Sequence, residues 1–484
     1  MKFFLVISII FFTNHSIAFC DIEKFDLASG NSLFDTIRSL PDSIFIDKIV
    51  VSGNKRTKEK IIIREITFER NQYYKADQLK DLIEESRENL INTSLFNFVI
   101  INIHKHPKQP DQINISINVM ERWYTWVFPI LEFKERNFNT WWKLMDYTKV
   151  NYGLSFLQEN IRGRREELEL DVSLGFDEMF KIAYQFPSIN KQQTIGMGFG
   201  YGYKRNHEVF YKTEQNELQY FKDEIEYTRK DQFAAIFITL RKGIHNTHTF
   251  QFQVDQLQIA DTIIQLNPNY TFKDQDNLSF VSFYYKYKND YRDYKHYPLE
   301  GHYFDIELIN HGFGILKNKG LNVFYILTNY RKFWNLKKRF YYAAGFTGKI
   351  SANTFQPYIL QFGLGFNNHF IRGYEYYVID GQHFAIIKSN FKYEILPTKV
   401  KTISFIPIKK FKTIHYAAYL NLFADMAYVD DNTFKEGNNL NNTLIFGTGI
   451  GLDFVTYYDN VLRLEYAFNK MKESGIFIHF TAPI

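Results

Sequence analysis

The residue types that most often carry enzyme chemistry are present in this sequence, but not in the spacings that catalysis requires. His207-Glu208 begins like a zinc-protease motif, yet no second histidine follows at the required position. The pairs His104/His106 and His245/His248 are isolated, and we interpret them as surface histidines. Neither a G-x-S-x-G elbow nor a Walker loop occurs. We therefore predict no catalytic centre, no metal site and no cofactor.

Two stretches carry glycine at every second position, a spacing that superficially resembles a nucleotide-binding loop. The dinucleotide fingerprint requires a helix directly after the glycines, and no helix is expected here. We interpret both stretches as strand faces on which missing side chains let a sheet bend or let an inserted loop approach closely. The glycines are Gly196, Gly198, Gly200 and Gly202 in one stretch and Gly447, Gly449 and Gly451 in the other.

The most informative short stretch is Phe370-Ile371-Arg372-Gly373-Tyr374, about 110 residues before the C-terminus. It is followed by Asp380-Gly381 and Ser389-Asn390. An arginine can donate two parallel hydrogen bonds to one carboxylate. Arginine and tyrosine are also common at the tips of exposed loops, and a glycine often makes the turn there. The choice between these interpretations depends on the elements that position the stretch.

Composition limits which elements these can be. The chain of 484 residues contains 34 Tyr, 49 Phe and 5 Trp, yet 23% of its residues are charged and its mean hydropathy is −0.31. Beyond the N-terminus no apolar run approaches the roughly 18 residues that a membrane-spanning helix needs. The net charge of +5 is too small to indicate a nucleic-acid partner. Apolar and polar residues must therefore be closely interleaved.

The N-terminus has the features of a secretory signal peptide. Lys2 precedes a short apolar core, residues 3–12, and Ser16-Ile17-Ala18 fits a cleavage site between small residues. We assign residues 1–20 to this peptide and predict export. Cys20 is the only cysteine, which excludes a disulfide framework and a cysteine zinc cluster. It could carry a lipid, although Phe19 stands where lipoprotein signals have a small residue.

After a polar lead-in at residues 22–43, residues 44–122 predict a small α+β domain. Ile46 to Val51 is expected to be a strand, followed by a turn at residues 52–54. Thr57 is a plausible N-cap for the next helix. Helical spacing indicates a second helix over residues 76–92, and strands are expected at 98–103 and 112–120.

This segment resembles the polypeptide-transport-associated (POTRA) domain, in particular the copy next to the barrel in BamA-type assembly proteins. The resemblance rests on several pieces in the expected order, from Gly53, Asn54, Lys55, Arg56 and Thr57 to the closing Glu121-Arg122. Arg64-Glu65 and Asn92 to Phe96 lie between them. One such domain is present here, whereas typical bacterial assembly factors have several.

The remaining residues, 123–484, are dominated by short segments that alternate apolar and polar side chains. Such segments suit either a half-buried soluble sheet or a membrane barrel. Abundant aromatic residues and the secretory leader favour the barrel, with an apolar outer face and a polar lumen. At about 22 residues per strand and connection, the region would supply about sixteen strands. The predicted fold is therefore an α+β domain followed by an all-β barrel of about 16 antiparallel strands.

Within that barrel, Ile371, Arg372, Gly373 and Tyr374 resemble the arginine-glycine-aromatic motif of the long sixth extracellular loop in BamA-type barrels. The resemblance implies that the loop folds back into the lumen, where the arginine pairs with an acidic residue. Asp425 is the matching acid, although Ala427 stands where the family usually has glycine. Alternation independently turns Asp425 inward, where a carboxylate avoids lipid. A solvated Asp425 with no specific partner is the alternative.

The first and last barrel strands are expected to form a weak seam. The first should lie near Trp126 to Phe133, where Pro129 removes one backbone donor. The last should lie at Gly475 to Phe480 and is short. A weakly paired edge could serve as a template to which another protein adds strands.

The resemblance implies an outer-membrane insertase of the BamA/TamA type, which is not an enzyme. Its POTRA domain would lie in the periplasm. The expected partners are outer-membrane lipid, unfolded outer-membrane proteins and periplasmic or lipoprotein partners at the POTRA domain, with no nucleic acid. The alternative is a pore that secretes one dedicated protein, as related two-partner transporters do. Those resemble one another in having two POTRA domains and a plug helix, and residues 22–43 look too short for that plug. A diffusive porin is disfavoured by the first domain.

Overall fold

The computed structural model describes residues 41–480 apart from 107–108, 134–137, 146, 148, 315–319, 354, 367–368, 404–408 and 457–459. The expected signal peptide and residues 22–40 of the lead-in therefore lie outside the described residues. The main boundary between two compact units falls between Tyr124 and Thr125. Each unit has its own sheet and its own buried side chains.

In its described residues, the first unit is a four-stranded sheet with two helices. Its strands are β1 (Ser43–Ser52), β2 (Tyr73–Lys75), β3 (Phe96–His106) and β4 (Gln109–Glu121), in the order β2-β1-β4-β3. β1 and β4 are parallel and the other pairs antiparallel. The helices are α2 (Glu59–Ile63) and α3 (Ala76–Ile91). The expected elements are present, and the short edge strand β2 is an addition that alternation did not indicate.

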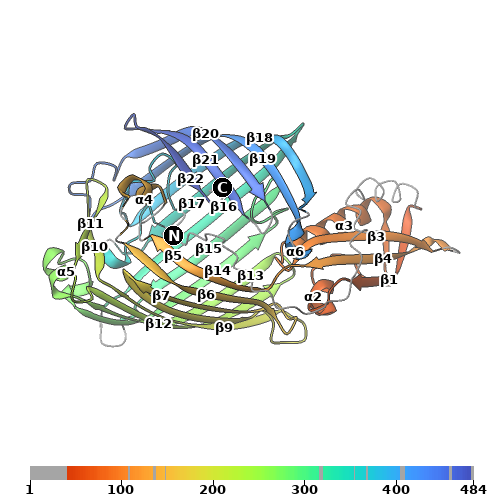
Figure 1. Ribbon diagram of the computed structural model, residues 1–484, viewed down its shortest axis with the longest axis horizontal. Helices are drawn as coiled ribbons and strands as arrows, with labels where there is room; N and C mark the ends of the chain where they lie inside the picture. The colour runs from red at the N-terminus through yellow and green to blue at the C-terminus, as the bar shows by residue number, and fades with distance from the viewer. Residues whose placement is uncertain are drawn as a thin grey trace. The chain divides into compact units, whose positions relative to one another are not determined.

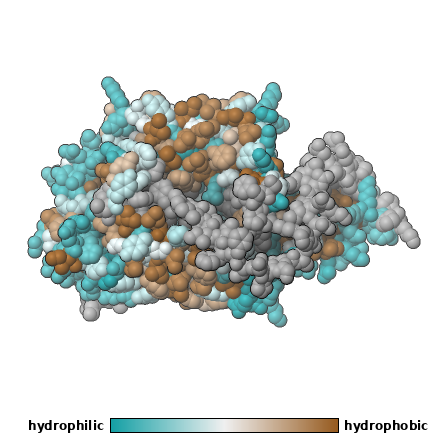
Figure 2. All heavy atoms as spheres, in the orientation of Figure 1, coloured by the Kyte–Doolittle hydropathy of each residue, from teal (hydrophilic) through white to brown (hydrophobic). Residues whose placement is uncertain are grey.

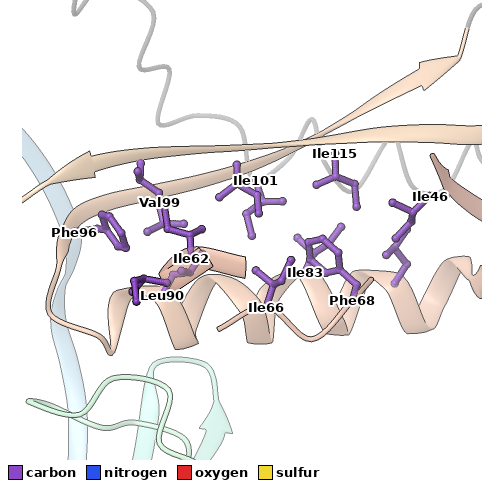
Figure 3. Close-up of a cluster of buried hydrophobic side chains, with 14 of the residues drawn as sticks. Ile46, Ile62, Ile66, Phe68, Ile83, Leu90, Phe96, Val99, Ile101 and Ile115 are labelled. Atoms are coloured by element: carbon purple, nitrogen blue, oxygen red, sulfur yellow. The ribbon is translucent and has the colours of Figure 1, made fainter. Parts of the chain in front are cut away.

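One hydrophobic core holds this unit together. α3 turns Leu79, Ile83 and Leu90 toward the sheet, because residues three and four apart share a helix face. They pack with Ile46 and Ile115 from neighbouring parallel strands, and Figure 3 shows side chains of helix and sheet meeting in a single layer. Burial of several large aliphatic side chains, each stabilising by about 1.5–3 kcal/mol, gives this small unit a core independent of the rest.

The expected helix cap at Thr57 is wrong. α2 begins at Glu59, and the preceding Lys58 makes no side-chain cap hydrogen bond. The Thr57 backbone N–H and hydroxyl instead donate to Glu121 Oε1, at 2.6 and 2.8 Å. Thr57 therefore binds the buried Glu121 carboxylate of β4 and does not cap α2. A buried carboxylate needs several hydrogen-bond donors, and Thr57 supplies two of them.

The second unit is a 16-stranded antiparallel sheet that curls into a barrel (Figure 1). Chain neighbours pair in turn from β5 to β22, except that β9 pairs with β12 because β10 and β11 form a separate hairpin. The strands are β5 (Thr125–Phe133), β6 (Val150–Ile161), β7 (Glu166–Gly175), β8 (Asp177–Phe186), β9 (Ile195–Asn206), β10 (Glu208–Glu214), β11 (Glu217–Lys222), β12 (Arg229–Lys242), β13 (Asn246–Ile259), β14 (Asn277–Asp290), β15 (Gly301–His311), β16 (Val323–Lys337), β17 (Phe340–Ser351), β18 (His383–Thr402), β19 (Thr413–Asp430), β20 (Leu444–Thr456), β21 (Val461–Asn469) and β22 (Ser474–His479). The predicted fold class is confirmed.

Short helices occupy the connections of the barrel. They are α4 (Phe138–Leu144), α5 (Asp261–Leu266), α6 (Lys409–Lys412) and the 3₁₀ turns η2 (Phe272–Asp274) and η3 (Tyr358–Leu360). Within the described part of the chain, no helix combines the length and the apolar character needed to cross a membrane.

The barrel wall has an apolar outer face and a polar inner face. Along β19 every second residue is buried, and the outward Leu422 and Met426 are 53% and 45% exposed. Figure 2 shows hydrophobic side chains gathered over the barrel wall. An exposed apolar band of this kind is costly in water and suits hydrocarbon. The alternation expected from the sequence is therefore realised with the polar side chains inside.

Candidate functional site: a lumenal loop and an open seam

The connection between β17 and β18, residues 352–382, is hereafter called loop six. Most of its described side chains are buried, and the Arg372 side chain has no solvent exposure. Arg372 contacts inward side chains of β18, β19 and β21, and Tyr374 contacts the backbone of β20. The loop therefore folds inward, and the barrel wall supplies the partners that the buried polar groups need.

Arg372 is held by a bidentate pair with Asp425. Its Nε donates to Asp425 Oδ2 at 2.7 Å, and its Nη2 donates to Asp425 Oδ1. Nη1 donates to Asn390 Oδ1 at 2.6 Å and lies 3.4 Å from Glu465 Oε1. The guanidinium carbon stands 4.0 Å from the centre of the Phe423 ring. The structure thus brings together the two residues paired by resemblance and adds partners from three strands.

A glycine of the barrel wall makes room for the loop backbone. A Cβ on Gly447 of β20 would lie 1.9 Å from the Arg372 carbonyl oxygen, so a larger residue would collide with the loop. The close approach of an inserted loop, one of the two roles inferred for the glycine stretches, occurs at Gly447. In the first stretch, the face of Gly198 and Gly202 instead accommodates the rings of Phe237 and Phe233 from β12.

The other motif residues fix the loop tip. Gly373 adopts φ +89°, which favours glycine, and its N–H donates to Glu375 Oε2 at 2.9 Å. The Tyr374 hydroxyl donates to the Phe446 carbonyl at 3.1 Å and accepts from the Lys470 N–H at 3.0 Å. Ile371 is buried in an apolar cluster with side chains of β19 and β20. These contacts give every motif side chain a place in the packing of the lumen.

A second charged group lies beside the first and was missed by the sequence analysis. Arg463 of β21 pairs with Asp453 of β20, its Nη2 donating to Oδ2 at 2.6 Å. Asn421 Nδ2 and the Tyr297 hydroxyl also donate to Asp453, at 2.9 and 2.6 Å. Inward alternation of Asp453 and Arg463, which face each other across the strand pair, was the signal that could have revealed them.

The outer end of loop six meets two other connections. The Tyr358 hydroxyl lies 2.8 Å from Thr213 Oγ1 in β10, and Asn216 of the same hairpin donates to the Val378 carbonyl and to Asn441 Oδ1. Asp380 is buried in this region, and burial raises its pKa to about 7. The hairpin β10–β11 therefore packs on the loop that folds into the lumen.

The seam between first and last strands carries no ladder of backbone hydrogen bonds within the described residues. β5 pairs with β6 from Thr125 to Phe133, and β22 pairs only with β21 in the strand order. Instead, Asn139 of α4 reaches the free edge of β22. Its Oδ1 accepts from the Ile478 N–H at 3.0 Å, and its Nδ2 donates to the Ile478 carbonyl at 3.4 Å.

The residues expected at the seam are found on or next to its strands. Trp126 stacks on Phe128 and Pro129 lies opposite Leu154 of β6. Phe133 ends β5, and Gly475 lies in β22 opposite Ala467. Phe480 is an exposed residue just beyond the end of β22. Their role in opening the barrel stays a prediction.

The motif residues of the first unit meet at its closing strand. Gly53 has φ +85°, and a Cβ there would lie 1.9 Å from the Val119 carbonyl oxygen. Asn54 Nδ2 donates to the Thr57 carbonyl, and the Arg56 N–H donates to Glu121 Oε1. The motif thus joins the end of β1 to the end of β4, which is a structural role.

Comparisons with known proteins agree with this architecture. Residues 44–122 match the POTRA family model, described as surface antigen variable number repeat. A search of curated protein sequences finds no match. Among solved structures, BamA from Haemophilus ducreyi lacking POTRA domains 1–3 is 14% identical with a TM-score of 0.47, covering 90% of this chain and 83% of that one.

Two CdiB structures are also similar. CdiB from Escherichia coli is 10% identical with a TM-score of 0.52, covering 90% of this chain and 75% of that one. CdiB from Acinetobacter baumannii is 11% identical with a TM-score of 0.46, covering 91% and 74%. At these identities the Escherichia coli structure supports the fold alone. Residues 44–122 are therefore a POTRA domain, and the chain has the fold of a POTRA unit followed by a 16-stranded barrel.

Proposed function

We propose that this chain is an outer-membrane protein that inserts other β-barrel proteins, as BamA/TamA-type proteins do, with its POTRA domain in the periplasm. The apolar outer face of the barrel supports a membrane location, because lipid is the environment that such a face requires. The secretory leader expected from the sequence supports export. The proposed role is not enzymatic.

The observation that carries the proposal is the seam. A client strand has unpaired N–H and C=O groups that cannot enter hydrocarbon unsatisfied. β22 is six residues long, and its outer edge is met by the amide of Asn139 rather than by β5. A client strand could replace that amide and pair with the edge, so that its backbone is satisfied before it meets lipid.

The POTRA sheet offers a further edge to clients or lipoprotein partners. β3 is an edge strand of 11 residues that pairs only with β4 in the strand order. Strand addition at such an edge is a common form of peptide recognition. The first unit could thus receive unfolded clients in the periplasm.

The second candidate is a secretion pore for one dedicated protein. The buried loop six favours this pore. Side chains of the loop bind the barrel wall inside the lumen, and movement of the loop could open a path for the secreted protein. The same loop and its contact with the β10–β11 hairpin argue against a permanently open diffusion pore. The insertase and the secretion pore use the same barrel. In the first a client strand leaves through the seam into the membrane, and in the second a protein passes through the lumen.

Depletion of the protein distinguishes the two candidates. Outer-membrane and secreted proteomes are compared by quantitative mass spectrometry before and after depletion. Loss of many barrel proteins from the outer membrane is expected for an insertase. Loss of one secreted protein, with barrel proteins unchanged, would reject insertion in favour of the pore.

A further inference from the structure

Three potential metal ligands converge beside the Arg372 network. They are Glu375 of loop six, Glu465 of β21 and His479, the final residue of β22. Their ligand atoms all lie within 4.8 Å of one another. Among the described residues this group draws together three segments that are far apart in sequence, which is why no motif indicated it.

The two distances from His479 to the carboxylates suit tetrahedral coordination, and the two carboxylate oxygens lie within 4.8 Å of each other. His479 Nε2 lies 3.4 Å from Glu375 Oε1 and 3.2 Å from Glu465 Oε2. Zinc bonds to histidine nitrogen and carboxylate oxygen are about 2.0–2.2 Å, so two ligands of a tetrahedral zinc stand about 3.3–3.5 Å apart. One ion could therefore reach all three atoms with small adjustments.

The hydrogen-bond pattern independently points to a ligand. Glu465 is 2% exposed, and neither its Oε2 nor His479 Nε2 has a hydrogen-bond partner in the described chain, although they approach each other. The remaining oxygens are engaged: Glu465 Oε1 faces Arg372, and Glu375 Oε2 accepts from the Gly373 N–H. Buried polar atoms left without partners are costly and rare.

The main alternative is a protonated histidine between the two carboxylates. A single Nε2–H can donate fully to only one oxygen at a time, and neither contact has hydrogen-bond geometry. The Phe370 ring stacks on the imidazole, with centroids 5.4 Å apart and planes at 17°. This contact holds the ring so that Nε2 faces both carboxylates.

We propose that Glu375, Glu465 and His479 bind one Zn²⁺, with water in the fourth position. The ion would bind the Glu465 Oε2 and His479 Nε2 lone pairs, which lack donors, and would link β22 to β21 and to loop six. It would therefore hold the last strand, the free side of the seam, against the lumenal network. This inference does not depend on whether the protein inserts or secretes.

The test uses the full-length protein in detergent, stripped with a chelator and then dialysed. Zinc content by mass spectrometry and affinity by competition with a chromophoric chelator are measured for the wild type, His479→Gln and the control His302→Gln. His302 lies in β15 and contacts Asn289, away from the cluster. When zinc is added back, the wild type and the control should each bind one zinc ion per protein. Both should then unfold at a higher temperature than the same protein without metal.

Loss of an outer-shell partner alone weakens zinc binding about 10–100-fold, so removal of the ligand in His479→Gln should cost at least that much. Cobalt substitution of the wild type should give the intense visible bands of four-coordinate Co²⁺, a readout that holds even if the variant misfolds. Equal zinc affinity in wild type and His479→Gln, or cobalt bands of an octahedral ion only, would overturn the site.

Discussion

At the scale of single residues, the lumen is organised by buried charges that compensate one another. Arg372 is completely buried, and four groups surround its guanidinium: Asp425, Asn390, Glu465 and the face of Phe423. A cation taken from water costs several kcal/mol unless such partners replace the solvent. These partners compensate the buried charge of Arg372 in its position in the lumen.

Arg372→Ala and Asp425→Ala should each destabilise the barrel by about 3–5 kcal/mol, since each leaves an uncompensated buried charge. The double variant should be less unstable than the sum of the two. Lysine at position 372 should rescue only in part, because it lacks the planar fork. Unfolding of purified protein in a double-mutant cycle measures the coupling.

The exposed pair Lys212–Glu214 provides the control cycle, where solvent screening should leave the two substitutions close to additive. Coupling between positions 372 and 425 of less than ~0.5 kcal/mol would contradict the buried pair.

Asn139→Ala should expose the edge of β22. It removes two hydrogen bonds to the Ile478 backbone, each worth about 0.5–1.5 kcal/mol. Amide hydrogen exchange at Ile478 should become faster, whereas Asn139→Asp, which keeps only the acceptor, should have an intermediate effect. Asn335→Ala, which removes an exposed contact with Glu300, should leave that amide unchanged. Unchanged exchange in Asn139→Ala would show that β22 has another partner.

At the scale of elements, loop six depends on a wall built to receive it. The close approach of the Arg372 carbonyl to Gly447 makes β20 a surface that fits the loop backbone. The loop also supplies Asp380, a buried acid whose charge is poorly compensated. The position of loop six therefore depends on steric fit against Gly447 and on the protonation state of Asp380.

Gly447→Ala should push the loop away from the wall, because the new methyl group would overlap the Arg372 carbonyl oxygen. Overpacking of this kind costs about 1–3 kcal/mol. Gly200→Ala is the matched control, since its nearest neighbour would be 3.9 Å away. Limited proteolysis of loop six and the unfolding temperature measure the difference. Equal behaviour of the two variants would mean that the loop does not press on β20.

Asp380 should make stability fall as pH rises. Burial raises its pKa to about 7, nearby Asp431 adds to the rise, and Thr213 and Lys349 oppose it. The unfolded carboxyl has a pKa near 3.9. Between about pH 4 and 7 the folded state therefore holds a proton that the unfolded state has lost, and stability declines on the order of a few kcal/mol.

Asp380→Asn should abolish that decline and unfold at a higher temperature than the wild type at pH 8, with little difference at pH 4. The half-buried Asp223, whose carboxylate accepts from two backbone N–H groups, is the control, and Asp223→Asn should give no such gain at pH 8. Parallel pH profiles for the wild type and Asp380→Asn would reject the buried acid as their cause.

At the scale of the whole molecule, two units with separate cores share one chain. The POTRA core is composed of residues from its own sheet and helices, and the barrel ladder begins only at Thr125. Such units can fold independently.

Deletion of residues 44–122 should therefore leave a barrel that folds but does not support client assembly. The truncated protein should still migrate differently on gels when unheated, because a folded barrel resists detergent. Outer-membrane fractions from cells that carry only this form should lose barrel proteins. Full assembly activity in such cells would remove the POTRA domain from the mechanism.

Much of the architecture could be predicted because it follows from local geometry. Successive side chains of a strand point to opposite faces, so the alternation around Asp425 was sufficient to turn Asp425 inward and Leu422 outward. Spacing by three and four residues likewise located α3. The prediction failed where a side chain binds a residue distant in the sequence. Thr57 was expected to cap a helix, but its hydroxyl donates a hydrogen bond to Glu121 instead.

The sequence by itself determined the order of the elements and the face on which each side chain lies, because these depend on residues a few positions apart. Only the tertiary structure decided which side chains contact each other across the barrel. Asn139 meets Ile478 across 339 positions, Tyr297 meets Asp453 across 156, and Arg372 meets Glu465 across 93. Strand register, the curl of the sheet and the insertion of loop six bring these residues together, and no local pattern contains that information because the paired residues are far apart in the sequence.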